Sequence, residues 1–229
     1  MDALWYALSV GWLLMCVLVL VLAVVFAVRH ARTRNVKIHR LSRLAHARGW
    51  QYRFEDLVVL LRYRGTPFDR GADRAAQHVI TGTHRGRPFC CFEYSFNRVQ
   101  VSRTGTRSNH FRIYAVRTPT WRPALQVTRE DLGTQLVDSV TGHDLQLEST
   151  AFNQTFRVLT ENDRFAYDVL NPRMMEWMLR DPRALNVPFR FERDELVAWE
   201  RGTFEGHMVE SGVDYLCDIL DRVPDFVWK

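Results

Sequence analysis

Four polar residues are of the types from which a hydrolytic site can be built. Glu93 lies in the stretch FEYSF, where a strand is expected to end. Glu148, Ser149 and Asn153 surround an expected turn in ESTAFN. A carboxylate beside a hydroxyl and an amide can form part of a hydrolytic site. If these residues converge with an Arg or His in one deep pocket, the chain is a hydrolase of unknown substrate.

The same residues also have a purely structural explanation. Short polar residues between strands usually satisfy backbone groups, which need partners when they are buried. The sequence contains no GxSxG nucleophile elbow, no P-loop and no GxGxxG motif. We therefore expect Glu148, Ser149 and Asn153 to tie a connection between strands to the neighbouring backbone. We also expect the chain to be non-catalytic.

The cysteines and histidines do not have the spacing of a metal site. Cys16, the adjacent pair Cys90 and Cys91, and Cys217 form no CxxC pattern, and the eight histidines form no HxH or HExxH pattern. We expect no metal ion and no cofactor. The four cysteines are expected to be reduced thiols packed as small apolar side chains. On a strand, Cys90 and Cys91 would point to opposite faces.

The N-terminal segment predicts a membrane span. Residues 4–28 form a run of 25 residues without a charge, which at about 1.5 Å per residue exceeds the roughly 30 Å hydrocarbon core of a bilayer. Trp5, Tyr6 and Trp12 lie toward its N-terminal end, where aromatic rings favour the interface. A cleaved signal peptide would need a basic N-terminal region and a shorter apolar run. We therefore expect residues 1–28 to be an uncleaved transmembrane anchor.

The charges beside the span predict its orientation. Seven Arg or Lys residues lie between residues 29 and 48, and none precedes the span. Basic residues near a span are retained in the cytoplasm, so the N-terminus is expected outside and the C-terminal domain in the cytoplasm. Residues 29–48 are expected to form a basic juxtamembrane helix that either binds lipid or only fixes this topology. Its candidate membrane-surface contacts are Arg29, Arg32, Arg34, Lys37, Arg40 and Arg43.

The location of the positive charge argues against nucleic-acid binding. The chain carries 31 basic and 26 acidic residues, a net charge of +5. Seven of the basic residues lie in the juxtamembrane run and Asp2 precedes it, so residues 49–229 hold 24 basic and 25 acidic residues, a net charge of −1. A nucleic-acid-binding domain carries its basic excess on the folded surface. The expected partners are instead the lipid bilayer, its anionic head groups, or a membrane protein.

Residues 49–229 alternate between strand and helix patterns. Gly49 is expected to end the preceding helix, and Asp56 is expected to cap a turn over residues 57–63. Asp163 is expected to cap a helix through residue 170, and Asn171-Pro172 a second one. A last helix is expected over residues 208–222. The expected strands cover residues 50–54, 78–83, 88–96, 98–104, 110–118, 125–127, 144–147, 155–159, 189–191 and 196–199.

These patterns predict an α+β protein. An N-terminal transmembrane helix would be followed by an antiparallel-sheet domain packed with helices on one face. The expected domains are the transmembrane anchor at 1–28, the basic juxtamembrane helix at 29–48 and the cytoplasmic α+β domain at 49–229. Hairpins are expected at 78–96 and, around the turn ERDE, at 189–199.

A series of motifs carries a resemblance to a known group. The segments RGWQY, TPFDRG, TGTHRGRPF, FEYSF, ESTAFNQTFRV and NPRMMEWML together are similar to uncharacterised single-span membrane proteins of high-GC Gram-positive bacteria. The resemblance covers most of residues 46–200. It implies one N-terminal span followed by an α+β domain, and it brings no known activity and no functional residues.

Two functions follow as hypotheses. The first is a non-catalytic domain at the inner membrane face that binds or scaffolds a protein or lipid, and it predicts an exposed apolar or basic patch. The second is a membrane-attached hydrolase that uses Glu93, Glu148 and Asn153.

Overall fold

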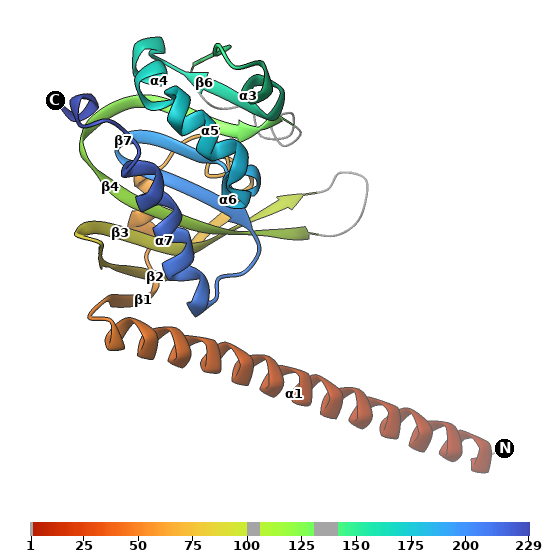
Figure 1. The fold of residues 1–229 in the computed structure, drawn as a ribbon. Coiled ribbons are helices and arrows are strands. Elements are labelled where there is room, and N and C mark those ends of the chain that lie inside the picture. The colour runs from red at the N-terminus through yellow and green to blue at the C-terminus, as the bar shows by residue number, and fades with distance from the viewer. Residues whose placement is uncertain (1, 100–105, 131–141) are drawn as a thin grey trace. The chain divides into compact units, whose positions relative to one another are not determined.

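A computed structural model describes residues 2–99, 106–130 and 142–229. The chain forms two compact units, residues 1–40 and residues 41–229. The architecture is α+β, as the sequence predicts. It consists of a long N-terminal apolar helix and an antiparallel sheet packed with helices (Figure 1).

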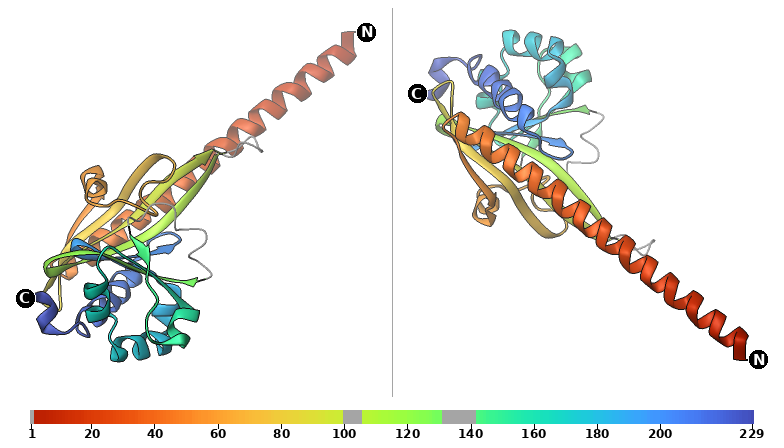
Figure 2. Two further views of the ribbon diagram at one scale, coloured as in Figure 1. Left: turned by 90° about the horizontal axis from the view of Figure 1, so that it is seen from above. Right: turned by 90° about the horizontal axis from the view of Figure 1, so that it is seen from below.

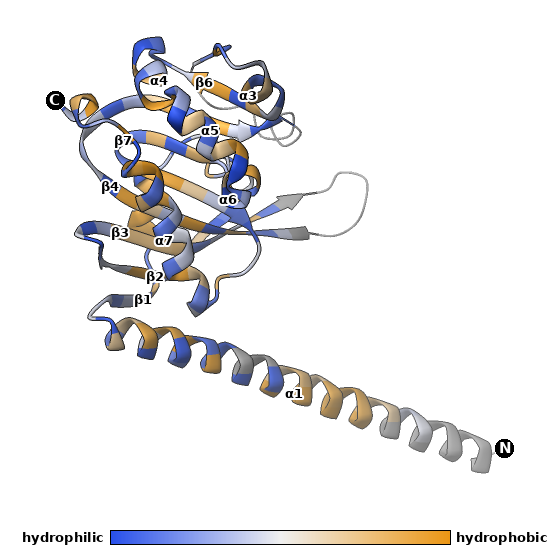
Figure 3. Cartoon of the chain, in the orientation of Figure 1, coloured by the Kyte–Doolittle hydropathy of each residue, from blue (hydrophilic) through white to orange (hydrophobic). Residues whose placement is uncertain are grey.

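The first unit consists of helix α1 (Asp2–Ala47) up to Arg40. By length and composition this helix can cross a membrane. The large apolar side chains described between Met15 and Val28 are exposed, Phe26 by as much as 74%, and Figure 3 shows this part of α1 as an apolar stretch. The helix passes residues 28 and 29 without interruption, so the change from apolar to basic residues occurs within one helix.

The last two turns of α1 belong to the second unit. Leu41 and Ala45 are 1% and 0% exposed and lie in the larger hydrophobic core, while Arg43 and His46 are exposed. Gly49 follows at φ +69°, a conformation that favours glycine and ends the helix as the sequence predicts. Leu41 and Ala45 lie on the apolar face that could have contacted lipid. They pack instead in the core and stabilise the helix end on the folded domain.

The second unit is built on one antiparallel sheet. Its described strands run in the order β1-β2-β3-β4-β6-β5, and β7 also pairs with β4. The longest strand, β4, pairs with β3, β6 and β7 along different parts of its length. The bounds are β1 (Gln51–Glu55), β2 (Ala72–His84), β3 (Arg87–Val99), β4 (Thr106–Arg129), β5 (His143–Asp144), β6 (Phe156–Thr160) and β7 (Phe189–Arg201).

Short helices follow the capping signals of the sequence. Asp56 accepts a hydrogen bond from the Val58 N–H at the start of the 3-10 helix η1, and Asn171 precedes Pro172 at the start of α5. The cap of α4 is Asn162 rather than the expected Asp163, because the Asn162 side chain reaches the Phe165 N–H. The bounds are η1 (Leu57–Arg62), α3 (Thr150–Thr155), α4 (Asp163–Val169), α5 (Pro172–Arg180), α6 (Pro182–Asn186), α7 (Gly206–Leu220) and η2 (Asp225–Trp228).

Both faces of the sheet are covered, whereas the sequence analysis expected one. The larger core lies under helices α3 to α7, and the smaller core lies under η1 and the loop that follows it. Figure 2 shows these helices and η1 on opposite sides of the sheet. Cys91 belongs to the larger core and Cys90 to the smaller one, as strand alternation requires. Two cores form because β3 carries apolar residues on both of its faces.

Several expected strand ends are wrong, because pairing with β4 extends the strands. Residues 189–199 form one strand, β7, in which Arg193 at φ +59° replaces the expected hairpin turn. The segment 125–127 is part of β4, which continues through Pro119 and Pro123 with an irregular register between Arg117 and Leu125. Such bulges bend a strand without ending it.

Three further expectations change. Strand β5 covers only His143–Asp144, and helix α3 begins within the expected turn ESTAFN. Residues 98 and 99 end β3, and the rest of the expected strand 98–104 lies outside the described residues.

Candidate interaction surface

The structure places Ser149 and Asn153 in backbone contacts. The Asn153 amide accepts a hydrogen bond from the Leu147 N–H (3.0 Å) and donates one to the Leu147 carbonyl (2.6 Å). Ser149 caps α3 by accepting a hydrogen bond from the Phe152 N–H. Glu148, which precedes Ser149 and was expected to share this role, is exposed. Ser149 and Asn153 therefore hold the connection between β5 and β6, which is the structural role that their position in the sequence predicts.

Glu93 has a separate environment. It lies in the middle of β3 rather than at a strand end, since β3 extends to Val99. Its buried carboxylate contacts His110 Nδ1 at 2.9 Å and accepts a hydrogen bond from the Phe204 N–H at 3.0 Å. These contacts fasten the segment before α7 to the sheet. Glu93 and the pair Ser149 and Asn153 thus serve different connections.

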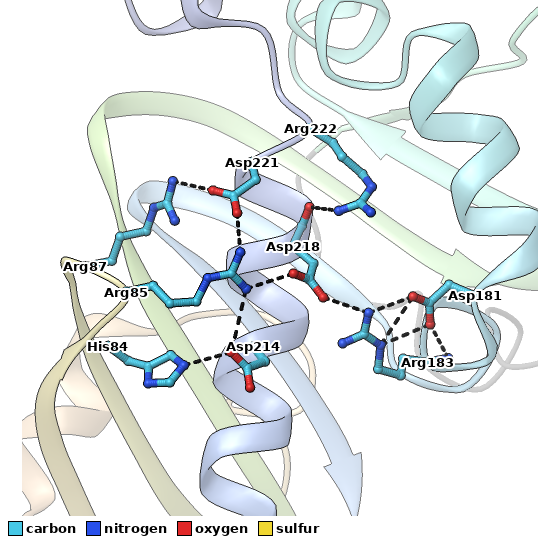
Figure 4. Close-up of polar contacts among 9 residues, drawn as sticks. All are labelled: His84, Arg85, Arg87, Asp181, Arg183, Asp214, Asp218, Asp221 and Arg222. Carbon is cyan, nitrogen blue, oxygen red and sulfur yellow. Dashed lines mark hydrogen bonds and ion pairs between the residues drawn. The ribbon is translucent and has the colours of Figure 1, made fainter. Parts of the chain in front are cut away.

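The densest ion-pair network also joins structural elements. Arg85, in the turn between β2 and β3, contacts Asp214 and Asp218 of α7 and Asp221, which follows its last residue (Figure 4). Asp218 also accepts a hydrogen bond from Arg183 of α6 at 2.8 Å, and Arg183 pairs with Asp181 at 2.7 Å. Because the charges are paired with one another, the network fixes the β2–β3 turn to α6 and α7.

The network shifts the pKa values of its members. Hydrogen bonding from Arg183 holds the pKa of the Asp181 carboxyl below its usual value. Partial burial acts in the opposite direction at Asp218, but hydrogen bonds from Arg85 and Arg183 outweigh it and lower the pKa of that carboxyl as well. Both aspartates therefore favour their charged forms in the folded protein.

The basic residues expected to meet the membrane surface lie along α1. In the first unit, Arg29, Arg32, Arg34 and Arg40 are exposed, and Lys37 is half-buried. Arg43 is exposed in the part of the helix that belongs to the second unit. The positive charge that follows the apolar run therefore lies on mostly exposed side chains.

The second unit presents an apolar surface on η1, which we call the η1 surface. It consists of Leu57, Val58 and Leu61, whose exposed fractions are 54%, 69% and 78%. The next residue pointing inward, Val59, is buried in the smaller core. Exposed apolar residues are common singly, but three on one short turn form a patch of the kind that marks an interaction site.

A buried arginine holds the chain that follows the η1 surface. Arg190 is 2% exposed and donates hydrogen bonds to the backbone carbonyls of Arg64 and Thr66. Its charge is compensated by Glu192 at 2.7 Å, and its guanidinium lies 5.4 Å from the centre of the Trp199 ring. A buried charge with several partners is costly to displace. The loop after η1 is therefore fixed to the sheet.

Two further contacts fix the same region. Arg62, the last residue of η1, pairs with the largely buried Glu195 of β7, and the Tyr94 hydroxyl donates a hydrogen bond to the Phe68 carbonyl at 3.0 Å. Tyr63 packs against Phe68 with ring centres 4.9 Å apart, and burial raises the pKa of its phenol well above the usual value. The η1 surface thus lies on a rigid base.

A shallow hollow of about 300 Å³ lies beside η1. Arg62, Arg117 and Glu195 supply its charges. A second hollow, of about 460 Å³, shares Thr81 and Gly82 with the first and is otherwise lined by residues between Arg48 and Gln51 and by Thr83. Glu93, Glu148 and Asn153 line neither of these two hollows.

Neither the η1 surface nor its supports can be recognised in the sequence. LVVLL in residues 57–61 has the composition of a buried segment, so its exposure depends on tertiary structure. The local sequence around the anchor is equally uninformative, because Arg190 stands between Phe189 and Phe191 in a strand. In a strand this alternation is also typical of a solvent-facing side, so the burial of Arg190 depends on the second core that covers the other face of the sheet.

Comparisons with known proteins bear on the fold. The chain matches no protein-family model and no curated protein. It is similar to a solved structure, the crystal structure of the mycobacterial trehalose monomycolate transport factor A, TtfA. The TM-score is 0.57 and the sequence identity 16%, over 81% of this chain and 95% of that one. At this identity the likeness shows a shared fold.

Proposed function

We propose that this chain is a non-catalytic, membrane-anchored protein whose α+β domain binds a lipid or protein at the inner membrane face in support of lipid transport. The observation that carries the proposal is the η1 surface. Three exposed apolar side chains lie on a base fixed by Arg190 and Arg62, in a chain whose first helix can cross a membrane. A preorganised apolar surface of this kind favours binding, since little order is lost on association.

The solved relative supports the cellular context of this proposal. TtfA is described as a transport factor for trehalose monomycolate, which is a lipid. A shared fold alone does not transfer a function, so the transport role rests on this likeness together with the membrane helix and the η1 surface. The polar residues that could have built a hydrolase act in separate contacts, at Phe204 for Glu93 and at Leu147 for Asn153, which favours the non-catalytic alternative.

The orientation is part of the proposal. Seven basic residues follow the apolar run and none precedes it, and such an excess keeps its side of the span in the cytoplasm. The domain would then lie at the inner face, where it can reach lipids of the inner leaflet and cytoplasmic parts of membrane proteins.

A complementation experiment tests the function. A deletion strain of the bacterium of origin would receive the full chain or a variant with Leu57→Ser, Val58→Ser and Leu61→Ser. The readout is the amount of each lipid that reaches the cell envelope. We expect the deletion to lower the export of at least one lipid and the triple variant to fail to restore it, although it folds and reaches the membrane.

A matched control removes exposed apolar side chains elsewhere. Tyr167 and Phe226 are 46% and 58% exposed, so Tyr167→Ser with Phe226→Ser should restore export. Unchanged lipid export in the deletion strain, or full restoration by the triple variant, would refute the proposed function.

A further inference from the structure

The arginines around the η1 surface point outward, whereas their carboxylate partners point inward. Arg53 pairs with Asp56 at 2.9 Å, and the exposed fractions of the two side chains are 67% and 16%. Arg62 pairs with Glu195, and the corresponding fractions are 41% and 10%. Each pair therefore presents a guanidinium to the solvent and keeps its carboxylate against the protein.

This arrangement gives the η1 surface a cationic rim. Arg53 precedes η1, Arg62 ends it and the exposed Arg64 follows it, while Glu55 is the exposed acidic residue of the same stretch. A guanidinium has five N–H donors and uses only some of them in one ion pair. The remaining donors match phosphate oxygens, which arginine recognises well.

An apolar centre with an outward guanidinium rim fits one kind of partner in particular. Aliphatic side chains favour the boundary between lipid head groups and acyl chains, and nearby arginines favour anionic head groups. An interface with another protein would more often combine an apolar centre with a rim of both signs, accessible to a complementary partner. Here the acidic members of the two ion pairs, Asp56 and Glu195, are covered, which leaves three exposed arginines and one exposed acid, Glu55, along residues 53–64.

Anchoring by helix α1 allows a small surface to bind the membrane. Helix α1 can cross the membrane, and a transmembrane helix holds a chain at the bilayer far more firmly than a surface contact does. Linking two binding elements makes the second event intramolecular and raises its effective concentration. Three aliphatic side chains would bind a bilayer weakly on a free protein, but on an anchored one they form a second, intramolecular contact.

We propose that the η1 surface docks on an anionic phospholipid bilayer, with Leu57, Val58 and Leu61 entering the interface and Arg53, Arg62 and Arg64 contacting phosphate groups. This inference rests on the proposed function and names the partner of the same surface. It assigns to the domain a second contact with the membrane, additional to helix α1. Docking of this kind depends on lipid charge and weakens as salt screens the head groups.

A fluorescence experiment on the full chain tests the docking. Leu61→Cys would carry an environment-sensitive nitrobenzoxadiazole label in a Cys16→Ser background, because Cys90, Cys91 and Cys217 are buried. The protein would be reconstituted into vesicles of phosphatidylcholine, or of phosphatidylcholine mixed with phosphatidylglycerol, each with and without lipids that carry a shallow nitroxide quencher. A matched label at Glu176→Cys, on α5 and 62% exposed, reports on a surface outside the proposed contact.

The proposal predicts a blue shift and quenching at position 61 in the anionic vesicles, and neither change at position 176. Arg53→Gln with Arg64→Gln should reduce the docked-to-undocked ratio about 25-fold, because one guanidinium near an anionic surface contributes about fivefold. Arg62 is left unchanged in this variant so that Glu195 keeps its partner.

Three results would overturn the proposal. A label at position 61 that stays in water in both kinds of vesicle excludes bilayer docking. Equal insertion into neutral and anionic vesicles excludes the role of the guanidinium rim. A label that stays in water in vesicles without other proteins, but is shielded from water in native membranes, identifies a protein partner instead. That last result leaves the proposed function standing, since the complementation experiment tests the function independently of the partner's chemistry.

Discussion

The end of helix α1 is part of the folded domain, and a pair of leucine substitutions tests this. Leu41 is 1% exposed in the larger core, whereas Leu61 is 78% exposed on η1. Leu41→Ala removes buried apolar groups and leaves a cavity, which for leucine costs about 2–5 kcal/mol. Leu61→Ala removes the same atoms from an exposed position, where substitutions change stability by no more than about 0.5 kcal/mol.

The expected cost at Leu41 is about 3 kcal/mol, in the lower half of that range, because Leu41 lies next to Gly206 and the site can relax in part. For a domain of this size each kcal/mol lowers Tm by about 2–4 °C, so the expected decrease is about 6–12 °C. Thermal unfolding of the full chain in detergent would be followed by near-UV circular dichroism, which reports on the packing of buried aromatic residues such as Trp199.

The comparison between the two leucines decides the result. Equal Tm values for Leu41→Ala and the wild type would show that the helix end does not pack on the domain. Equal losses for both leucines would show that η1 is buried, which would also remove the basis of the η1 surface. A chain that begins at residue 49 lacks Leu41 and Ala45, and we expect it to unfold at a lower temperature than a chain that begins at residue 41.

Two other predictions concern polar contacts. Asn153→Ala should lower the free energy of unfolding by about 1–3 kcal/mol, because both backbone groups of Leu147 lose their side-chain partner. Denaturant unfolding measures this loss, with a substitution of the exposed neighbour, Gln154→Ala, as control. Equal stability of the two variants would contradict the prediction. The lowered pKa values of Asp181 and Asp218 contribute stability that is present above their unfolded-state pKa of about 4 and is lost as the pH falls through their folded-state values. Tm should therefore decrease below about pH 4 more steeply in the wild type than in Asp218→Asn, and parallel Tm profiles would show that the network does not stabilise the fold.

Local signals predicted the parts of the fold that depend on few residues. Asp56, Gly49 and Asn171-Pro172 mark helix ends because caps and stops involve only neighbouring backbone groups. The α+β class followed from the alternation of strand and helix patterns. The contacts of Asn153 were also predictable, since a short polar side chain between strands has backbone groups within reach.

Long-range pairing explains what the sequence did not reveal. ERDE at residues 192–195 has turn composition, but pairing with β4 keeps it in strand β7, with Arg193 absorbing the irregularity. The second buried face of the sheet depends on η1, which is distant in sequence from Val197 and Trp199 in the same core. The exposure of Leu57, Val58 and Leu61 likewise depends on which residue of LVVLL the core accepts, and the structure assigns that place to Val59.

The side of the membrane on which the domain lies is the central claim, and reporter fusions at Lys229 measure it most directly. One fusion would carry a reporter that is active only in the cytoplasm, and the other a reporter that is active only outside it. The seven basic residues after the apolar run predict activity of the cytoplasmic reporter alone. Replacing Arg29, Arg32, Arg34 and Lys37 with Asn, with arginines added near Asp2, should shift the balance toward the opposite orientation. An active external reporter on the unmodified chain would contradict the account, because it would place the η1 surface and the buried thiols on the outer side of the membrane.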